Sequence, residues 1–150
     1  MRLATDAKTL ITVCCLWCCM SAQAGTNWFN VMGDAADESV NTIEVDPTPV
    51  SIAGETRIMR VRVSRSQDRV NQEGVPYRSF VSEVLFDCPS SMARYLSINY
   101  YRLPAWKGEP YLRREYIETQ PRLMQFRDVE PNPVRRIIRA ACNTSTITNN

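Results

Sequence analysis

The sequence contains no histidine among its 150 residues. Histidine is the usual proton-transfer partner of nucleophilic serine and cysteine and the commonest metal ligand. Its absence therefore argues against Ser-His and Cys-His catalysis and against most metal centres. Glycine is scarce as well, and none of the five glycines belongs to a Gly-rich loop that could cradle phosphate groups. We therefore predict that the protein is not an enzyme and holds neither a cofactor nor a metal ion.

One kind of catalysis needs no histidine. Pairs of carboxylates can support lyase or glycosidase chemistry, and two pairs lie close together in the sequence, Glu83 with Asp87 and Glu115 with Glu118. Acidic side chains at such positions are far more often solvated charges on strands and loops. We favour that second interpretation for both pairs.

A long hydrophobic run is also missing. The most apolar stretch, Thr9–Met20, has about twelve residues, whereas a membrane-spanning helix needs ~20. This stretch follows Arg2 and Lys8 and is followed by Ala22-Gln23-Ala24, and the three parts together are typical of a secretory signal peptide. We expect residues 1–24 to be cleaved on export to the periplasm, the cell surface or the extracellular space.

Cysteine is concentrated in this predicted leader, which contains four of the six cysteines: Cys14, Cys15, Cys18 and Cys19. Cysteines at C-x-x-C spacing can clamp zinc, but cysteine also serves as a small hydrophobic residue, which is the interpretation we favour here. Cleavage would leave Cys88 and Cys142, which export to an oxidising compartment should join. Closing a loop of about 55 residues stabilises a fold by ~4 kcal/mol in the chain-entropy model.

Acidic and basic residues nearly balance, with 16 of the first kind and 18 of the second, so the charge does not indicate a nucleic-acid partner. The two signs are segregated along the chain. Residues 25–56 contain six acids and no base, whereas residues 57–150 contain 16 bases, 15 of them arginine, and nine acids. Such charges can form a patch that steers a charged partner, or they can pair across neighbouring strands. We favour the pairing.

Two consecutive segments have the clearest strand patterns. In Thr56–Arg65 apolar residues alternate with polar ones, and Met59, Val61 and Val63 fall on one face, which is typical of a half-buried antiparallel strand. Tyr77–Cys88 is apolar on both faces, which indicates a central strand that is covered on both sides.

The other elements are expected from shorter patterns. Further strands are predicted at residues 28–31, 42–46, 50–52, 94–102, 111–118 and 123–129. The polar segment Ser66–Pro76 is expected to be a mobile hairpin connection, with Arg65 and Arg69 as solvated loop charges. Residues 133–142 are predicted to form an amphipathic helix that begins after Asn132 and buries Cys142.

The predicted strand at residues 94–102 is rich in tyrosine. A strict period of two places Tyr95, Ser97, Asn99 and Tyr101 on one face of this strand. Tyrosine is favoured at interfaces, so this face is either an exposed binding surface or a cover for the sheet. The pattern does not decide between these two roles.

Several short motifs follow one another along the mature chain: Trp28, Ile43-Glu44-Val45-Asp46, Ser51-Ile52, Leu85-Phe86-Asp87-Cys88, Tyr100-Tyr101, Pro131-Asn132-Pro133 and Ala141-Cys142. Their order resembles the surface-adhesin protein E family of Gram-negative bacteria. The resemblance covers essentially the whole mature chain, and Asp87-Cys88 and Cys142 are its strongest anchors. It implies an α+β domain at residues 25–143, followed by a flexible tail at 144–150. The implied fold is a curved antiparallel sheet of about six strands, with a short C-terminal helix fastened to it by the disulfide.

The resemblance also implies a secreted binding protein of the bacterial envelope or surface, of the adhesin type, with a host extracellular or envelope protein as its partner. The residues that we predict to contact this partner are Arg60, Arg62, Tyr95, Tyr101 and Trp106. The alternative is a periplasmic envelope or inhibitor protein whose loop Leu103–Pro110 enters a partner's cleft. We expect no nucleic-acid partner and no stable membrane span, and the sequence does not indicate an oligomeric state.

Overall fold

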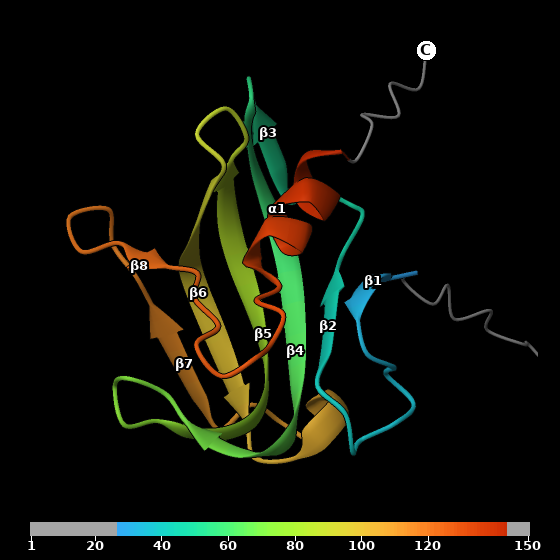
Figure 1. Ribbon diagram of the computed structural model, residues 1–150. Coiled ribbons are helices and arrows are strands. Elements are labelled where there is room, and N and C mark those ends of the chain that lie inside the picture. The colour runs from blue at the N-terminus through green and yellow to red at the C-terminus, as the bar shows by residue number, and fades with distance from the viewer. Residues whose placement is uncertain (1–26, 144–150) are drawn as a thin grey trace, which may run out of the picture.

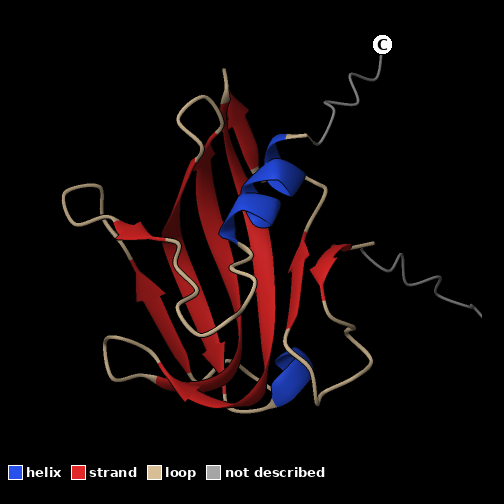
Figure 2. Ribbon diagram, viewed as in Figure 1, coloured by secondary structure: helices blue, strands red, loops and turns tan. Residues whose placement is uncertain are grey.

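The computed structural model describes residues 27–143, which form one antiparallel sheet with a helix lying across one of its faces (Figures 1 and 2). The predicted leader at residues 1–24 and the predicted tail at 144–150 lie outside the described residues. In chain order the elements are β1 Phe29–Met32, β2 Thr42–Val45, β3 Ser51–Ala53, β4 Thr56–Val70, β5 Pro76–Asp87, β6 Met92–Tyr101, the 3-10 helix η1 Pro104–Trp106, β7 Leu112–Glu115, β8 Arg122–Leu123 and α1 Val134–Cys142.

The main path of the sheet runs in the order β1-β2-β4-β5-β6-β7, and two short strands are added to it, β3 beside β4 and β8 beside β6. Every pair of neighbouring strands is antiparallel. The predicted α+β fold, an antiparallel sheet of about six strands with a C-terminal helix, is therefore confirmed.

Strand β4 divides the sheet into two chemically different faces. Met59, Val61 and Val63 are all fully buried, as their alternation with polar residues predicts. We call the face that contains these three side chains the inner face. The opposite face, to which Arg60 and Arg62 belong, is called the outer face.

The inner face is covered by α1 and by the segment at residues 124–133, which passes in front of the sheet before the helix begins (Figure 1). The buried side chains of this cover include Met124, Phe126, Val129, Ile137, Ile138 and Ala141. Burying an isoleucine stabilises a fold by about 1.5–3 kcal/mol, so the apolar stripe of α1 helps to hold the helix on the sheet. The Asn132 carboxamide accepts a hydrogen bond from the Val134 N–H at 3.1 Å, at the predicted helix start.

A disulfide joins the central strand to this helix. Cys88 directly follows β5 and Cys142 is the last residue of α1, with an S–S distance of 2.10 Å and a Cα–Cα distance of 5.8 Å. The predicted pairing is confirmed. The bond covalently links the end of the central strand to the end of the helix that covers the sheet.

The predicted loop at Ser66–Pro76 is wrong over most of its length, because β4 continues to Val70 and β5 begins at Pro76. The two strands stay paired past an irregularity in which residues 65–68 face only Arg78. The Arg78 side chain stabilises this bulge by donating to the Arg65 carbonyl at 2.7 Å and to the Glu38 carbonyl at 3.2 Å. The polar composition of residues 66–69 therefore does not end strand β4.

The last two predicted strands are shorter than expected. The first is confirmed as β7, but the strand expected at residues 123–129 is reduced to β8. One further bond follows β8, from the Met124 N–H to the Ala93 carbonyl at 2.9 Å. The chain then leaves the edge of β6 to cover the inner face, because Met124 and Phe126 gain more by burial against the core than by continued pairing at the edge.

A candidate partner-binding face

The outer face carries four of the five residues predicted to contact a partner. Arg60 and Arg62 extend from β4, Tyr101 extends from β6, and Trp106 reaches the same face from η1. Strand β5 separates β4 from β6, so Tyr101 lies about 10 Å across the sheet from the arginine row. The fold therefore brings these residues, predicted from separate segments, onto one surface.

Arg62 is at the centre of an aromatic cluster. Its guanidinium carbon lies 4.3 Å from the ring centroid of Trp28 and 4.0 Å from the ring centroid of Trp106. Its Nε also bonds to a Glu44 carboxylate oxygen at 2.5 Å. A planar guanidinium stacks well on indole faces, and its ion pair fixes it in that plane. We call Trp28, Arg62 and Trp106 the Trp–Arg–Trp cluster.

Hydrogen bonds to the sheet hold Trp106 in place. Its indole N–H donates to the backbone carbonyls of Val63 at 3.1 Å and of Phe80 at 3.0 Å. The Ser79 hydroxyl accepts from the Trp106 backbone N–H at 3.1 Å. Trp106 has a φ of 57°, in the left-handed region that costs a non-glycine residue energy, so these bonds offset a backbone strain. The loop is thereby locked onto its own sheet.

Ion pairs link the acidic first part of the chain to the arginine-rich remainder. Arg60 pairs with the buried carboxylate of Asp46 at 2.7 Å, Arg62 pairs with Glu44, and Lys107 pairs with Glu38. The first two pairs cross neighbouring strands, as the favoured interpretation of the segregated charges predicts, whereas Lys107 and Glu38 both lie outside the strands. As a result, the outer face is rich in charged groups that are largely neutralised.

Tyr95 does not lie on the outer face, and the prediction that it shares a face with Tyr101 is wrong. Between Glu83 and Val84 the register of β5 and β6 shifts, because Leu96 is an extra residue in β6. A bulge of one residue reverses the alternation, so Tyr95 points to the inner face and is only 6% exposed. It cannot contact a partner from this position.

Around Tyr95 the inner face holds an aromatic group in the core. Its ring packs edge-on to Phe80, which in turn contacts Tyr77 and Tyr100. Burial raises the pKa of the Tyr95 hydroxyl, and the nearby Tyr77 and Tyr100 add to the rise. Burial is also the main reason why the pKa values of Tyr77 and Tyr100 are raised.

Tyr101 remains on the outer face, where its side chain is partly exposed. Partial burial raises the pKa of its hydroxyl, and the Glu109 carboxylate adds to the rise. The phenol is therefore a neutral hydrogen-bonding group at physiological pH, with an apolar ring and a polar tip. These are the properties that make tyrosine a frequent interface residue.

Arg65 is fully buried, which corrects its prediction as a solvated loop charge. Its Nη2 bonds to an Asp128 carboxylate oxygen, and the Nε of Arg69 lies 3.4 Å from the same atom. The burial follows from the alternation of β4, because Arg65 is two residues after the inner-face residue Val63 and therefore faces the 124–133 segment. Both arginines serve as anchors for that segment.

Two residues of the outer face were not predicted to belong to it. Trp28 and Glu44 were seen only as parts of predicted strands and of the family motifs. The signal for Trp28 is its position directly before β1, since Phe29 pairs with the inner-face residue Val45 and its neighbour must point the other way. Glu44 lies opposite Arg62 in the register, which only the strand pairing reveals.

Both carboxylates of one pair weighed for catalysis, Glu115 and Glu118, contact arginines. Glu115 pairs with Arg113 at 3.1 Å, and Glu118 lies 3.5 Å from Arg94. Among residues 27–143, no group of three or more histidine, cysteine, aspartate or glutamate side chains could hold a metal ion. No helix in this part of the chain is long and apolar enough to cross a membrane.

The fold and this face define a class: a disulfide-closed antiparallel sheet with one polar, aromatic face and one face sealed by a helix. Comparison with protein families gives the particular assignment, because the profile of the family described as surface-adhesin protein E matches residues 28–143. The chain belongs to this family, so it is a protein of the surface-adhesin type. No match is found among curated proteins or among solved structures.

Proposed function

We propose that this protein is an exported, non-enzymatic binding protein of the bacterial envelope or surface, and that its outer face holds a host extracellular protein. The Trp–Arg–Trp cluster is the observation that carries this proposal. Tryptophan, tyrosine and arginine are the side chains that most often dominate the free energy of protein association. The cluster presents two of these three types in a rigid arrangement, and rigidity lowers the entropy lost on binding.

The charges of the outer face indicate how such a partner would be recognised. Arg60 and Arg62 are paired with the buried carboxylates of Asp46 and Glu44, so their positive charge is largely compensated at the surface. Recognition would then depend on aromatic packing and hydrogen bonds more than on long-range attraction. Binding should accordingly change little when added salt screens the exposed charges.

The alternative, an inhibitor whose Leu103–Pro110 loop enters a partner's cleft, has less support. The indole of Trp106 is turned onto the sheet and bonded to two backbone carbonyls there. A loop that inserted this side chain into a cleft would have to break both bonds and leave the stacked Arg62. Leu103 is the exposed apolar residue that such a loop would have to use instead.

The test is binding of the purified mature protein to reconstituted extracellular matrix, measured by surface plasmon resonance at low and high salt. A double variant, Arg60→Ala with Tyr101→Ala, removes outer-face contacts without touching the bonds that hold Trp106. We expect it to weaken binding by about 30-fold or more, which corresponds to the loss of a hot spot.

The control is Arg114→Ala. Arg114 lies on the inner-face side of β7, opposite Ile98, and its side chain is exposed. This variant removes an arginine away from the outer face and should change the affinity less than about twofold. If the wild-type protein does not bind matrix, or if the control loses as much affinity as the double variant, the proposal is wrong.

A further inference from the structure

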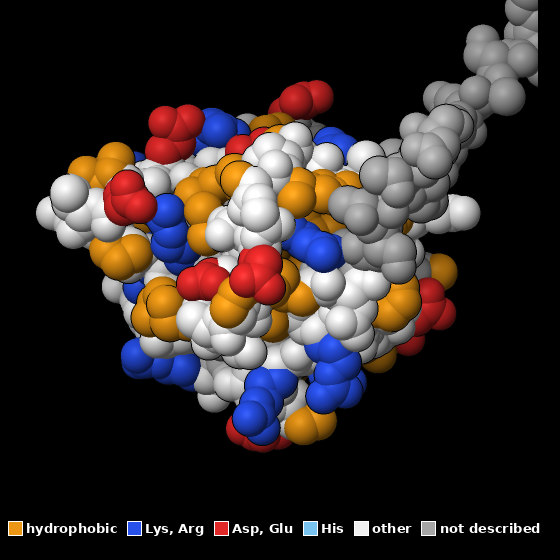
Figure 3. Space-filling view, turned by 90° about the horizontal axis from the view of Figure 1, so that it is seen from above, with side chains coloured by type: hydrophobic (Ala, Val, Ile, Leu, Met, Phe, Trp, Pro, Cys, Tyr) orange, Lys and Arg blue, Asp and Glu red, His pale blue; other side chains and the backbone are white. Residues whose placement is uncertain are grey.

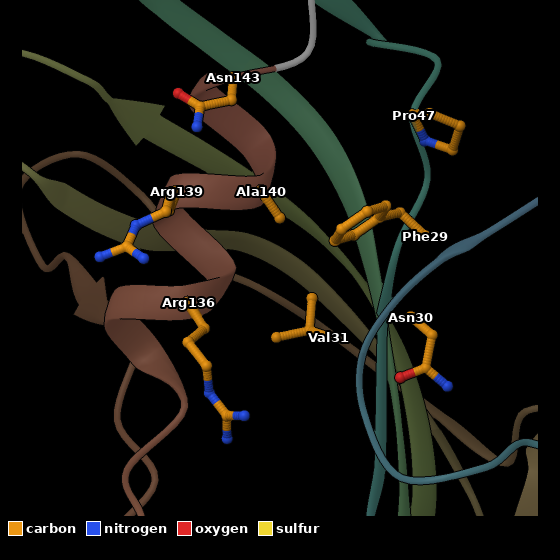
Figure 4. A pocket seen from close by; sticks show the side chains of 8 residues that line it. All are labelled: Phe29, Asn30, Val31, Pro47, Arg136, Arg139, Ala140 and Asn143. Atoms are coloured by element: carbon orange, nitrogen blue, oxygen red, sulfur yellow. The ribbon is translucent and has the colours of Figure 1, made fainter.

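A groove with apolar walls lies between the edge strand β1 and helix α1, on the side of the molecule opposite to the outer face. It has a volume of about 430 Å³, and its lining residues are Phe29, Asn30, Val31, Pro47, Arg136, Arg139, Ala140 and Asn143. In Figure 4 the side chains of Phe29, Val31 and Ala140 point into the space between the two elements. This volume lies within the range of about 300–1,000 Å³ that is typical of small-molecule sites.

The apolar walls are accessible to solvent. Phe29 is 56% exposed although it lies on the helix side of β1, opposite the fully buried Val45. An exposed phenylalanine beside further apolar residues in a concave surface indicates a ligand site more strongly than a scattered surface residue does. Seen from above, hydrophobic and basic side chains lie next to one another on the upper surface of the molecule (Figure 3).

The charges beside the groove are all of one sign. Arg136, Ala140 and Asn143 follow the spacing that places residues on one stripe of a helix, so Arg136 lies at the end of the groove where α1 begins. Arg135 and Arg139 are also exposed on α1. None of these three arginines forms a salt bridge with another residue of the range 27–143, whereas the outer-face arginines do.

We propose that this groove binds the acyl chain of a single-chain anionic lipid, with the carboxylate headgroup held at Arg136. The chain would lie along Val31, Ala140 and Phe29, and Arg139 would add positive potential from the flank of the helix. The positive end of the helix dipole is also at the Arg136 end of α1, so the carboxylate should lie at that end of the groove and the acyl chain should extend away from it. This site goes beyond the proposed partner binding and uses a different surface.

An acyl chain fits the groove better than a peptide does. A bound peptide brings backbone N–H and C=O groups that must be paired, and the groove offers few polar groups for them. The Asn30 carboxamide, one of those few, already donates to the Gly33 carbonyl at 2.7 Å. A hydrocarbon chain has no such requirement, and only its headgroup needs a polar partner.

Titration calorimetry of the mature protein with monomeric dodecanoate tests the proposal. We expect saturable one-to-one binding that weakens about tenfold or more for each pair of methylenes removed, as in decanoate and octanoate. Dodecyltrimethylammonium, with the same chain and a cationic head, should bind at least tenfold more weakly. Equal affinity for the two headgroups would overturn the role of the arginines.

Three variants locate the site. Arg136→Gln should weaken dodecanoate binding about tenfold, and Ala140→Trp, which fills the groove, should abolish it. Arg114→Gln removes an exposed arginine that is likewise outside the salt bridges of residues 27–143 but lies on β7, so it is the charge-matched control and should have no effect. A melting temperature close to that of the wild type shows that each variant is folded.

The outcomes separate this proposal from the proposed function. Arg60→Ala with Tyr101→Ala should leave dodecanoate binding unchanged, and Ala140→Trp should leave matrix binding unchanged. Binding to anionic vesicles without binding to monomeric dodecanoate would overturn the groove in favour of a membrane-surface contact. Absence of saturable dodecanoate binding, or binding that survives both Arg136→Gln and Ala140→Trp, would overturn it as well.

Discussion

Two arginines on the same strand, Arg62 and Arg65, show how differently the two faces of the sheet use one residue type. Arg62 stacks on two indoles at the outer surface, while Arg65 is 0% exposed on the inner side and bonded to Asp128. The first shapes a surface that a partner can reach. The second fastens the 124–133 segment over the core. Arginine content alone therefore says little about binding until the face is known.

The tyrosines of β6 repeat this contrast. Tyr95 belongs to the packed aromatic group of the inner face, and Tyr101 lies partly exposed on the outer face. The extra residue Leu96 in β6 places the two tyrosines on opposite faces of the sheet. The inner face determines stability and the outer face is available for recognition, so substitutions on the two faces should have different consequences.

The largest expected effect comes from releasing the cover of the inner face. Replacing both Cys88 and Cys142 with serine opens a loop with a sequence separation of 54 and should lower the free energy of unfolding by about 4 kcal/mol. Urea denaturation of the oxidised wild type and of the double variant measures this. A difference under about 1 kcal/mol would mean that apolar packing alone holds α1 on the sheet.

The tyrosine pair gives the sharpest contrast between the faces. Tyr95→Ala should cost about 3 kcal/mol, as large-to-small changes of buried aromatic residues do, whereas Tyr101→Ala should cost less than about 1 kcal/mol. Both values come from urea denaturation. Similar losses for the two variants would show that the bulge at Leu96 does not separate them.

Acidic partners of arginines provide a third comparison. Asp128→Ala leaves the guanidinium of Arg65 buried without its carboxylate, and because Asp128 is itself 46% exposed we expect a loss of about 2 kcal/mol. Asp68→Ala removes a pair with Arg78 in which the aspartate is 87% exposed, and should cost less than about 0.5 kcal/mol. Thermal denaturation of both variants tests the ranking, and the reverse order would contradict it.

The smallest effect concerns pH. Burial raises the pKa of Tyr95 in the folded protein, so above about pH 10 the unfolded chain releases its phenolic proton first. The folded state then binds more protons than the unfolded state, and the free energy of unfolding falls as the pH rises. Tyr95→Phe removes this contribution, so its stability should decline less steeply between about pH 9 and 11, measured by urea titration. An unchanged slope would contradict the assignment.

The sequence predicted the elements whose patterns are local. Alternation in β4, apolar faces on β5 and the arginine stripe of α1 all follow from periods of two or 3.6 residues, and the cysteine pair follows from export. The bulges at residues 65–68 and at Leu96 were missed, because an extra residue leaves no mark on composition. The bulge at Leu96 reverses the face of β6, which is why Tyr95 was misplaced, whereas Arg65 was misplaced because the polar segment that follows it was taken for a loop.

The candidate site was predicted in part for the same reason. Arg60, Arg62 and Tyr101 were found because strand alternation holds on both sides of them. Trp106 was found as an aromatic residue in a turn, but its docking on the carbonyls of Val63 and Phe80 depends on a loop conformation with positive φ values. The contribution of Trp28 depends on strand pairing across residues far apart in the sequence.

The most direct test of the central claim is hydroxyl-radical footprinting of the protein alone and bound to extracellular matrix. If the outer face is the binding surface, the complex will show lower radical reactivity at Trp28, Tyr101 and Trp106. The reactivity of Phe29, beside the groove, will be unchanged. Tyr95 will be unreactive in both states. Protection of Phe29 with unchanged reactivity at Trp28, Tyr101 and Trp106 would contradict the account.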